Sequence, residues 1–209
     1  MRLTAPKPAH PSMTPLILGG HPAMDFLNTA LAPRGQAIEL IGDGRSFVDW
    51  LVQAGLVEPE PGARMRRRFG SSALDAAAAE ARRFREWSRA WLSRWRAAPH
   101  ARYATELAEL NALLARARLV RELVHAESGR LEVVERVSIG AAAELIALLA
   151  AQVAALVAAE APALVKRCAG SGCTLWFLDH TKAHRRLFCS AAACGNRAKV
   201  AAFRARQAG

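Results

Sequence analysis

All four cysteines of this 209-residue chain lie within one short segment near the C-terminus, in the spacing Cys-x4-Cys-x15-Cys-x4-Cys. Two close pairs separated by a loop are typical of a tetrahedral zinc site with four thiolate ligands. Thiolates are soft anions, and Zn²⁺ accepts four of them without redox chemistry. The spacing therefore predicts one structural zinc ion with four ligands: Cys168, Cys173, Cys189 and Cys194.

Three alternatives to a zinc site stay open at the level of sequence. Disulfides are rare in the reducing cytosol, and the N-terminal residues show no apolar run typical of a secretory signal. An iron–sulfur cluster also uses four cysteines, although the symmetric pairs and basic surroundings favour zinc. Unliganded buried thiols would have to cluster by chance. His180 and His184 are interpreted as surface groups, because the cysteines already complete a tetrahedral shell.

The length of the chain allows one sizeable core plus a small appendage. A long helical stretch is predicted from about 63 to 96, with a break at Gly70. Four aromatic residues spaced by three and four share one face of it, as in a buried helix: Phe84, Trp87, Trp91 and Trp95. The alanine-rich segment 141–165 is interrupted by polar residues, so we interpret it as a core helix rather than a membrane span.

Shorter segments complete the predicted helical part. Ser46 is expected to cap a helix that stops at Gly55, and the sequence Glu-Pro-Glu-Pro-Gly at 58–62 is expected to be a connector. A further helix over 102–117 is expected to turn three leucines inward: Leu107, Leu110 and Leu114.

Extended segments are predicted at Leu16 to Leu18 and at Gln36 to Ile41, and a β-hairpin over 118–139. The fold class is therefore α+β: a mainly helical N-terminal domain with a small β-hairpin or sheet, then a small four-cysteine zinc-finger module that ends in a helix. The predicted boundaries are a disordered tail at 1–13, the α+β domain at 14–160 and the zinc module at 164–207.

Positive charge is concentrated in the last fifth of the chain. Residues 166–209 carry nine Lys or Arg and one acidic residue, whereas residues 1–165 are close to balanced. This distribution is typical of a protein that binds a polyanion. The cations with predicted nucleic-acid contacts are Lys182, Arg185, Arg186, Arg197, Lys199 and Arg204. Because four thiolates leave a zinc site negatively charged, some of these cations could instead donate to sulfur.

The final helix places two rows of cations on either side of a slim alanine face, which could approach DNA closely. A solvated basic helix is the alternative. The opposite face carries Val200 and Phe203, which could dock on the zinc module or on the main domain.

The tetrapeptide Cys194-Gly195-Asn196-Arg197 resembles the CGNR zinc finger, and the first cysteine pair, the Trp176 to Asp179 stretch and the Arg185-Arg186 pair also fit that family. Near the N-terminus, four residues resemble the start of the ABATE domain that usually precedes this finger: Asp25, Phe26, Asn28 and Thr29. Asn111 fits the same domain. The resemblance implies a bacterial stress-response transcription regulator with the finger as its DNA-binding part.

Two classes of function follow. The first is a zinc-dependent DNA-binding regulator, cytoplasmic and without a membrane span, whose N-terminal domain senses a small-molecule effector through Asp25, Asn28 and Thr29. Those three residues could equally form helix caps or a buried polar network. The second is a zinc-stabilised module that binds protein or RNA. An enzyme is not expected, because no nucleophile–base pair is visible and four cysteines close the metal shell. The oligomeric state is open.

Overall fold

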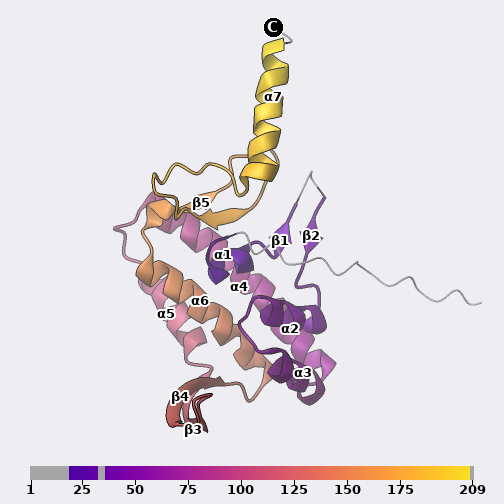
Figure 1. The fold of residues 1–209 in the computed structure, drawn as a ribbon, viewed down its shortest axis with the longest axis vertical. Helices are drawn as coiled ribbons and strands as arrows, with labels where there is room; N and C mark the ends of the chain where they lie inside the picture. Colours follow the sequence, from indigo (N-terminus) through magenta and orange to yellow (C-terminus); the bar gives the residue numbers. More distant parts are fainter. Residues whose placement is uncertain (1–18, 33–35, 208–209) are drawn as a thin grey trace, which may run out of the picture.

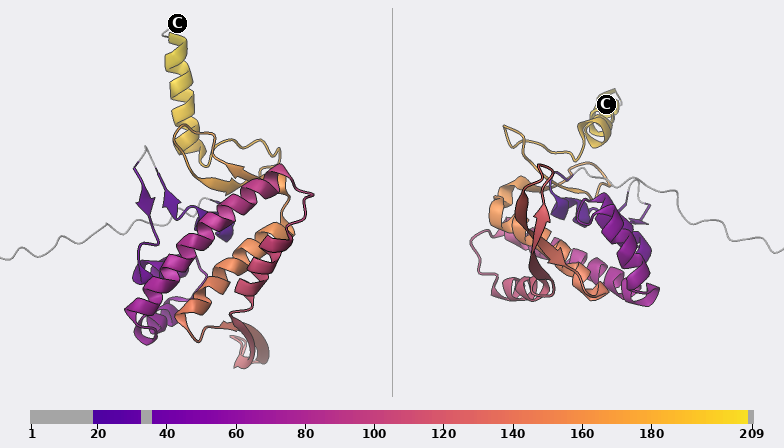
Figure 2. Two further views of the ribbon diagram at one scale, coloured as in Figure 1. Left: turned by 180° about the vertical axis from the view of Figure 1, so that it is seen from behind. Right: turned by 60° about the horizontal axis from the view of Figure 1, so that its bottom comes forward.

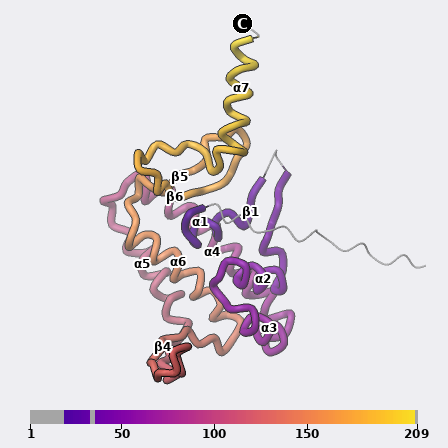
Figure 3. The backbone as a smooth tube through the Cα atoms, in the orientation of Figure 1, coloured from indigo at the N-terminus to yellow at the C-terminus, as the bar shows by residue number. Residues whose placement is uncertain are grey.

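The computed structural model describes residues 19–32 and 36–207. A helical body occupies the middle of the molecule, with α7 and the β3–β4 hairpin at opposite ends (Figures 1 and 3). The predicted tail and the predicted strand at Leu16 to Leu18 lie outside the described residues. The helices are α1 (Pro22–Leu27), α2 (Gly44–Gln53), α3 (Pro59–Arg68), α4 (Ser71–Ala97), α5 (Ala104–Leu114), α6 (Ile146–Ala159) and α7 (Asn196–Gln207), with the short turns η2 (Ala142–Leu145), η3 (Pro162–Leu164) and η4 (Ala191–Gly195).

The strands of the described chain form antiparallel pairs. The pairs are β1 (Ala30–Leu31) with β2 (Ile38–Glu39), β3 (Arg118–His125) with β4 (Leu131–Ser138), and β5 (Val165–Arg167) with β6 (Trp176–Leu178). The predicted hairpin over 118–139 and the mainly helical α+β class are therefore confirmed.

The long helix α4 crosses the whole body, and α5 and α6 run alongside it (Figure 2). It starts after Gly70, where the predicted break occurs and where φ is +43°. The predicted aromatic stripe lies in the core: Trp91 is 2% exposed, and a series of ring contacts runs from it through Trp87 and Phe84 to Phe26. These ring contacts join α4 to α1.

Two local predictions around α2 and α3 were wrong. Asp43, not Ser46, caps α2; Ser46 is the third helical residue and completes a capping box with Asp43. The segment at 58–62 is not a connector, because Pro59 begins α3. A proline is tolerated there since the first helical residues have no N–H partner to lose. Gly62 lets α3 approach α2, because a Cβ at Gly62 would lie 2.5 Å from a methyl carbon of Val52.

The helix α5 buries one of its three predicted leucines. Leu110 is buried and Leu114 half-buried, but Leu107 is 48% exposed, so its inward orientation was wrongly predicted.

The stretch Ala142–Ala159, which covers η2 and α6, is long and apolar enough to cross a membrane by length and composition. In this structure its large side chains instead face α1, α4 and α5, with Ile146, Leu149 and Val153 at most 2% exposed. We therefore interpret it as the core helix that the sequence predicts.

Strand β6 is buried on both of its faces. Trp176 and Leu178 belong to the core of the helical body, whereas Phe177 packs with the cysteines and Leu31. Successive strand residues point to opposite faces, so three consecutive residues join the helical body to the cysteine module.

A side-chain amide fixes this strand from the side of the helical body. The amide of Asn28, at the end of α1, donates to the Trp176 carbonyl at 2.8 Å, and its oxygen accepts the Trp176 N–H at 2.8 Å. Asn28 thus supplies both hydrogen bonds that a neighbouring strand would give, and the Leu178 N–H donates to the Gly19 carbonyl at 2.7 Å.

Asn28→Ala removes both bonds and leaves a buried N–H and carbonyl of Trp176 unpaired. We expect the free energy of unfolding of the zinc-loaded protein to fall by about 2–4 kcal/mol in chemical denaturation. The exposed Asn111 on α5 provides a matched control, and Asn111→Ala should change the same quantity by less than about 0.5 kcal/mol. Equal effects of the two substitutions would contradict this role of Asn28.

Candidate metal centre and nucleic-acid interface

The four cysteine sulfurs form one compact cluster, with all Sγ atoms within 4.8 Å of one another. Cys189 Sγ lies 3.8 Å from Cys173 Sγ and 3.6 Å from Cys194 Sγ. Four thiolates around a tetrahedral zinc at about 2.3 Å lie about 3.8 Å apart, whereas the sulfurs of a disulfide lie about 2 Å apart. The geometry fits a four-thiolate metal site.

Both cysteine pairs lie on tight turns that leave room for an ion. A Cβ at Gly170, between the first two cysteines, would come within 3.2 Å of Cys194 Sγ. Gly172 has φ +68°, a conformation that favours glycine. In the second pair, Cys189 precedes the π-helical turn η4 and Cys194 lies within it; Ser190 caps the start of this turn by accepting the Ala193 N–H at 3.2 Å.

Several N–H groups point at the sulfurs. The backbone N–H groups of Cys189 and Gly170 donate to Cys168 Sγ at 3.3 and 3.4 Å. The Arg197 guanidinium donates to Cys194 Sγ at 3.0 Å. Such donors stabilise thiolates bound to a metal and orient them, so the donors around the cluster fit a zinc site.

The thiol pKa values depend on burial and on these donors. Burial raises the pKa of Cys173 to about 11, and burial with the neighbouring thiols raises the pKa of Cys189. For Cys168 burial acts in the same direction, but the two backbone N–H donors and the hydrogen bonds from the neighbouring thiols together lower the pKa. Zinc binding must therefore displace protons from thiols, which makes zinc affinity fall as the pH falls.

A buried ion pair holds the finger loop that joins the two cysteine pairs. The carboxylate of Asp179 is fully buried and accepts from Lys166 Nζ at 2.6 Å and from the Arg186 N–H at 2.9 Å. Lys166 Nζ also donates to the His184 carbonyl at 2.6 Å. Burial raises the pKa of Asp179, but Lys166, Thr181 and the Arg186 N–H hold it well below its usual value. The sequence did not predict this pair, although Asp179 is the one acidic residue in 166–209.

Two of the predicted nucleic-acid residues serve the metal centre. The Arg186 guanidinium lies 4.3 Å from the centre of the Phe177 ring and donates to the carbonyls of Phe188 and Cys189. Arg197 donates to Cys194 Sγ. The hypothesis that some cations donate to sulfur is therefore confirmed for Arg197, whereas Arg186 binds the backbone beside Cys189.

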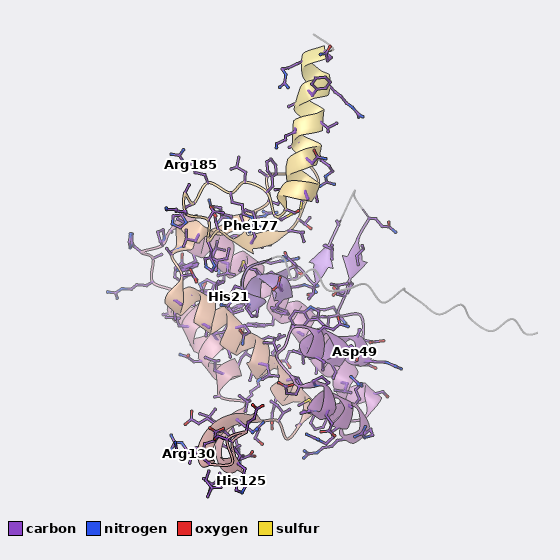
Figure 4. All side chains as sticks on the ribbon, viewed as in Figure 1. His21, Asp49, His125, Arg130, Phe177 and Arg185 are labelled. Carbon is purple, nitrogen blue, oxygen red and sulfur yellow. The ribbon has the colours of Figure 1, made fainter. Side chains whose placement is uncertain are left out.

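The other four predicted cations are exposed: Lys182, Arg185, Lys199 and Arg204. Their side chains form no ion pair within residues 19–32 and 36–207. Arg185 lies on the finger loop, at the same end of the molecule as α7 (Figure 4). The helix α7 has no buried residue, and Val200 and Phe203 are 42% and 56% exposed. Docking of this apolar face on the rest of the chain was therefore wrongly predicted.

The structure places Asp25, Asn28 and Thr29 in a buried polar network. Asp25 accepts the Gly19 N–H at 2.8 Å, and Asn28 holds Trp176. The Thr29 hydroxyl donates to the Phe26 carbonyl and accepts from Arg85, whose guanidinium also forms a two-bond pair with Glu39. A buried polar network was one of the alternatives to ligand binding that the sequence allowed. Ligand binding by these three residues stays a prediction.

Metal analysis tests the cysteine site. The full chain, purified in reducing buffer, should contain one zinc per chain, and Cys173→Ser should retain less than half of that amount because one of four ligand bonds is lost. The exposed Ser171 lies in the same turn, so Ser171→Ala should keep the full amount. Well under one zinc per folded wild-type chain would contradict the assignment.

Asp179→Asn tests the ion pair under the finger loop. A carboxyl with a lowered pKa stabilises the folded state above its usual pKa and loses this effect as the pH falls through the lowered value. At pH 7 we therefore expect Asp179→Asn to lower the Tm of the zinc-loaded protein by about 5 °C or more. Asp49 forms an ion pair with Arg66 that is only partly buried, whereas Asp179 is fully buried, so Asp49→Asn should lower the Tm by less than about 3 °C. The opposite order would refute the ion-pair role.

Family models match most of the chain. Residues 20–160 match ABATE, described as "Putative stress-induced transcription regulator", and residues 165–207 match the CGNR zinc finger. No curated protein matched the chain. Together with the sulfur geometry, the second match identifies the four cysteines as the site of one structural zinc ion. The chain belongs to the ABATE family and carries a CGNR zinc finger after its ABATE domain.

Proposed function

We propose that this protein is a zinc-dependent transcription regulator that binds duplex DNA through α7 and the adjoining finger loop. The observation that supports this most directly is the exposure of α7 to solvent along its whole length. It is a helix of 12 residues without a buried side chain, and it extends from the zinc centre away from the body (Figure 1). Apart from Arg197, which donates to Cys194 Sγ, its cations have no hydrogen-bond or ion-pair partner within the described chain and can contact phosphates.

The arrangement of side chains on α7 suits a DNA groove. Arg197 and Arg204 form one row along the helix, and Lys199 and Arg206 form another on the far side. The surface between these rows carries only alanines, at 198, 201, 202 and 205. A helix about 18 Å long with so slim a face fits the major groove, where cations reach phosphates and guanine edges.

The zinc centre would determine where α7 points. Cys194 is part of η4, which leads directly into α7, and Arg197 in the first turn donates to its sulfur. We therefore assign Arg197 and Arg186 to positioning, and phosphate contacts to Lys182, Arg185, Lys199 and Arg204. The family description supports regulation of transcription in response to stress. A bacterial, cytoplasmic regulator without enzymatic activity is the form that we propose.

A sensing role for the ABATE domain completes the proposal. Of the candidate sensing residues, Asn28 bonds directly to Trp176 of β6. Asp25 accepts the N–H of Gly19, whose carbonyl accepts the Leu178 N–H. The side-chain bonds of Thr29 stay within the ABATE domain. A ligand that altered this network would therefore act on β6, and through it on the zinc centre.

Salt-dependent binding to duplex DNA tests the function. We expect the affinity of the zinc-loaded protein for genomic fragments to fall steeply with salt, because each neutralised phosphate releases a counterion. Arg204→Ala and Lys199→Ala should each weaken binding and reduce the slope of log K against log salt by about 1. The exposed Arg130 at the tip of the β3–β4 hairpin is distant from α7 (Figure 4), so Arg130→Ala should change neither quantity.

Undetectable binding, or binding that salt does not weaken, would contradict the DNA proposal. The exposed Val200 and Phe203 favour a second candidate, a module that binds protein or RNA. Duplex RNA of the same length and charge separates DNA binding from RNA binding, because its deep, narrow major groove excludes a helix such as α7. Tighter binding to RNA than to DNA would favour the second candidate.

A further inference from the structure

One face of the β3–β4 hairpin concentrates exposed apolar side chains. Nine large hydrophobic side chains are exposed within the described residues, and five of them belong to this hairpin: Leu119, Leu123, Leu131, Val133 and Val137, with exposed fractions from 48% to 65%. The strand register pairs Leu119 with Val137 and Leu123 with Val133. Residues at alternate positions share a face, so all five lie on one side of the hairpin. We call this surface the hairpin face.

The hairpin face is exposed because the hairpin extends beyond the helical body. Figures 2 and 3 show it projecting beyond the ends of α5 and α6, at the end of the molecule opposite α7. Isolated two-stranded hairpins are marginally stable in water and usually need a third strand or a packed face. Clustered exposed apolar residues on a soluble protein mark interaction surfaces.

The centre of the hairpin face carries one ion pair. Arg121 Nε donates to Glu135 Oε1 at 2.9 Å, and the register places these two residues directly opposite each other between the two apolar rows. The face therefore presents a positive and a negative side chain next to each other, with apolar side chains on either side along the strands.

We propose that the hairpin face binds the same face of a second copy of this chain, and that the protein is a homodimer. A two-fold axis along the hairpin places each Arg121 opposite Glu135 of the partner subunit. The same operation places Leu119 opposite Val137 of the partner subunit and Leu123 opposite the partner's Val133. The face is thus complementary to itself in charge and in hydrophobicity, as a two-fold interface requires.

The Arg121–Glu135 ion pair favours a second copy of this chain over a different protein as the partner. A different protein would need its own opposed acidic and basic groups between two apolar rows, whereas a second copy supplies them by symmetry. Sheets pack face to face at about 10 Å, a distance at which side chains of this size interdigitate. The eight paired positions make the face about 27 Å long. A two-stranded face of this length buries little surface compared with a typical stable interface, so we expect a reversible dimer with a micromolar Kd.

This dimer does not rest on the proposed function. Its residues lie on the hairpin, away from the zinc centre and α7 (Figure 1). Failure of the DNA proposal would leave it unchanged, and a monomeric protein could still bind DNA.

Sedimentation velocity of the zinc-loaded full chain tests the dimer. Over about 1 to 200 µM, the wild type should shift from monomer to dimer. Arg121→Glu and Glu135→Arg should each raise the Kd at least about tenfold, because each places like charges opposite each other within and across the interface. An equimolar mixture of the two variants should form a heterodimer, since their faces then carry opposite charges across the interface.

The opposite side of the hairpin provides the matched control. Arg136 forms an ion pair with Glu122 at 3.2 Å on that side, so Arg136→Glu perturbs the hairpin equally but should leave the wild-type Kd unchanged. Circular dichroism checks that every variant is folded. If Arg121→Glu does not fold, Leu123→Ser, which only removes apolar area, should raise the Kd instead.

Three results would overturn the proposal. The first is a wild type that stays monomeric over the whole range. The second is a dimer that folded Arg121→Glu or Leu123→Ser weakens no more than Arg136→Glu does. The third is a mixture of the two charge variants that forms no heterodimer, because the pairing across the interface would then be absent.

Discussion

The burial of strand β6 on both faces is the interaction on which the rest of this structure depends. Trp176 and Leu178 pack in the core of the helical body, and Phe177 between them packs against the cysteines. The Asn28 amide satisfies the backbone of Trp176, which a short edge strand would otherwise leave unpaired in the core. A module of about 45 residues rarely holds a core alone. Here it shares one with the ABATE domain.

The zinc centre divides the basic residues of the C-terminal segment into two groups. Arg197 donates to a ligand sulfur, Arg186 donates to the backbone carbonyls of Phe188 and Cys189, and Lys166 neutralises the buried Asp179. The exposed cations of the finger loop and α7 form no ion pair in the described chain. Charge counting alone merges these groups, although only the second can contribute to binding of a polyanion. The zinc shell, by contrast, is closed by four sulfurs and serves structure.

The features predictable from sequence are those encoded by local spacing. Cysteine spacing predicted the metal cluster, the three- and four-residue spacing of aromatics predicted the buried face of α4, and alternation predicted the β3–β4 hairpin. The local errors have physical reasons: Pro59 starts a helix because the first helical residues need no N–H partner, and Asp43 competes with Ser46 for the cap position. The joint between Asn28 and Trp176 spans 148 positions, and no local pattern encodes such a contact.

Hydrogen exchange of the zinc-loaded full chain, followed peptide by peptide, tests the shared core most directly. Amides of β6 should exchange as slowly as those of α4 and α6, because one cooperative unit opens as a whole. Removal of zinc with a chelator should speed exchange in β6 and extend that effect to α1 through Asn28. Fast exchange in β6 beside a protected α4, in protein with zinc bound, would show that the finger is a separate unit and would contradict the shared core.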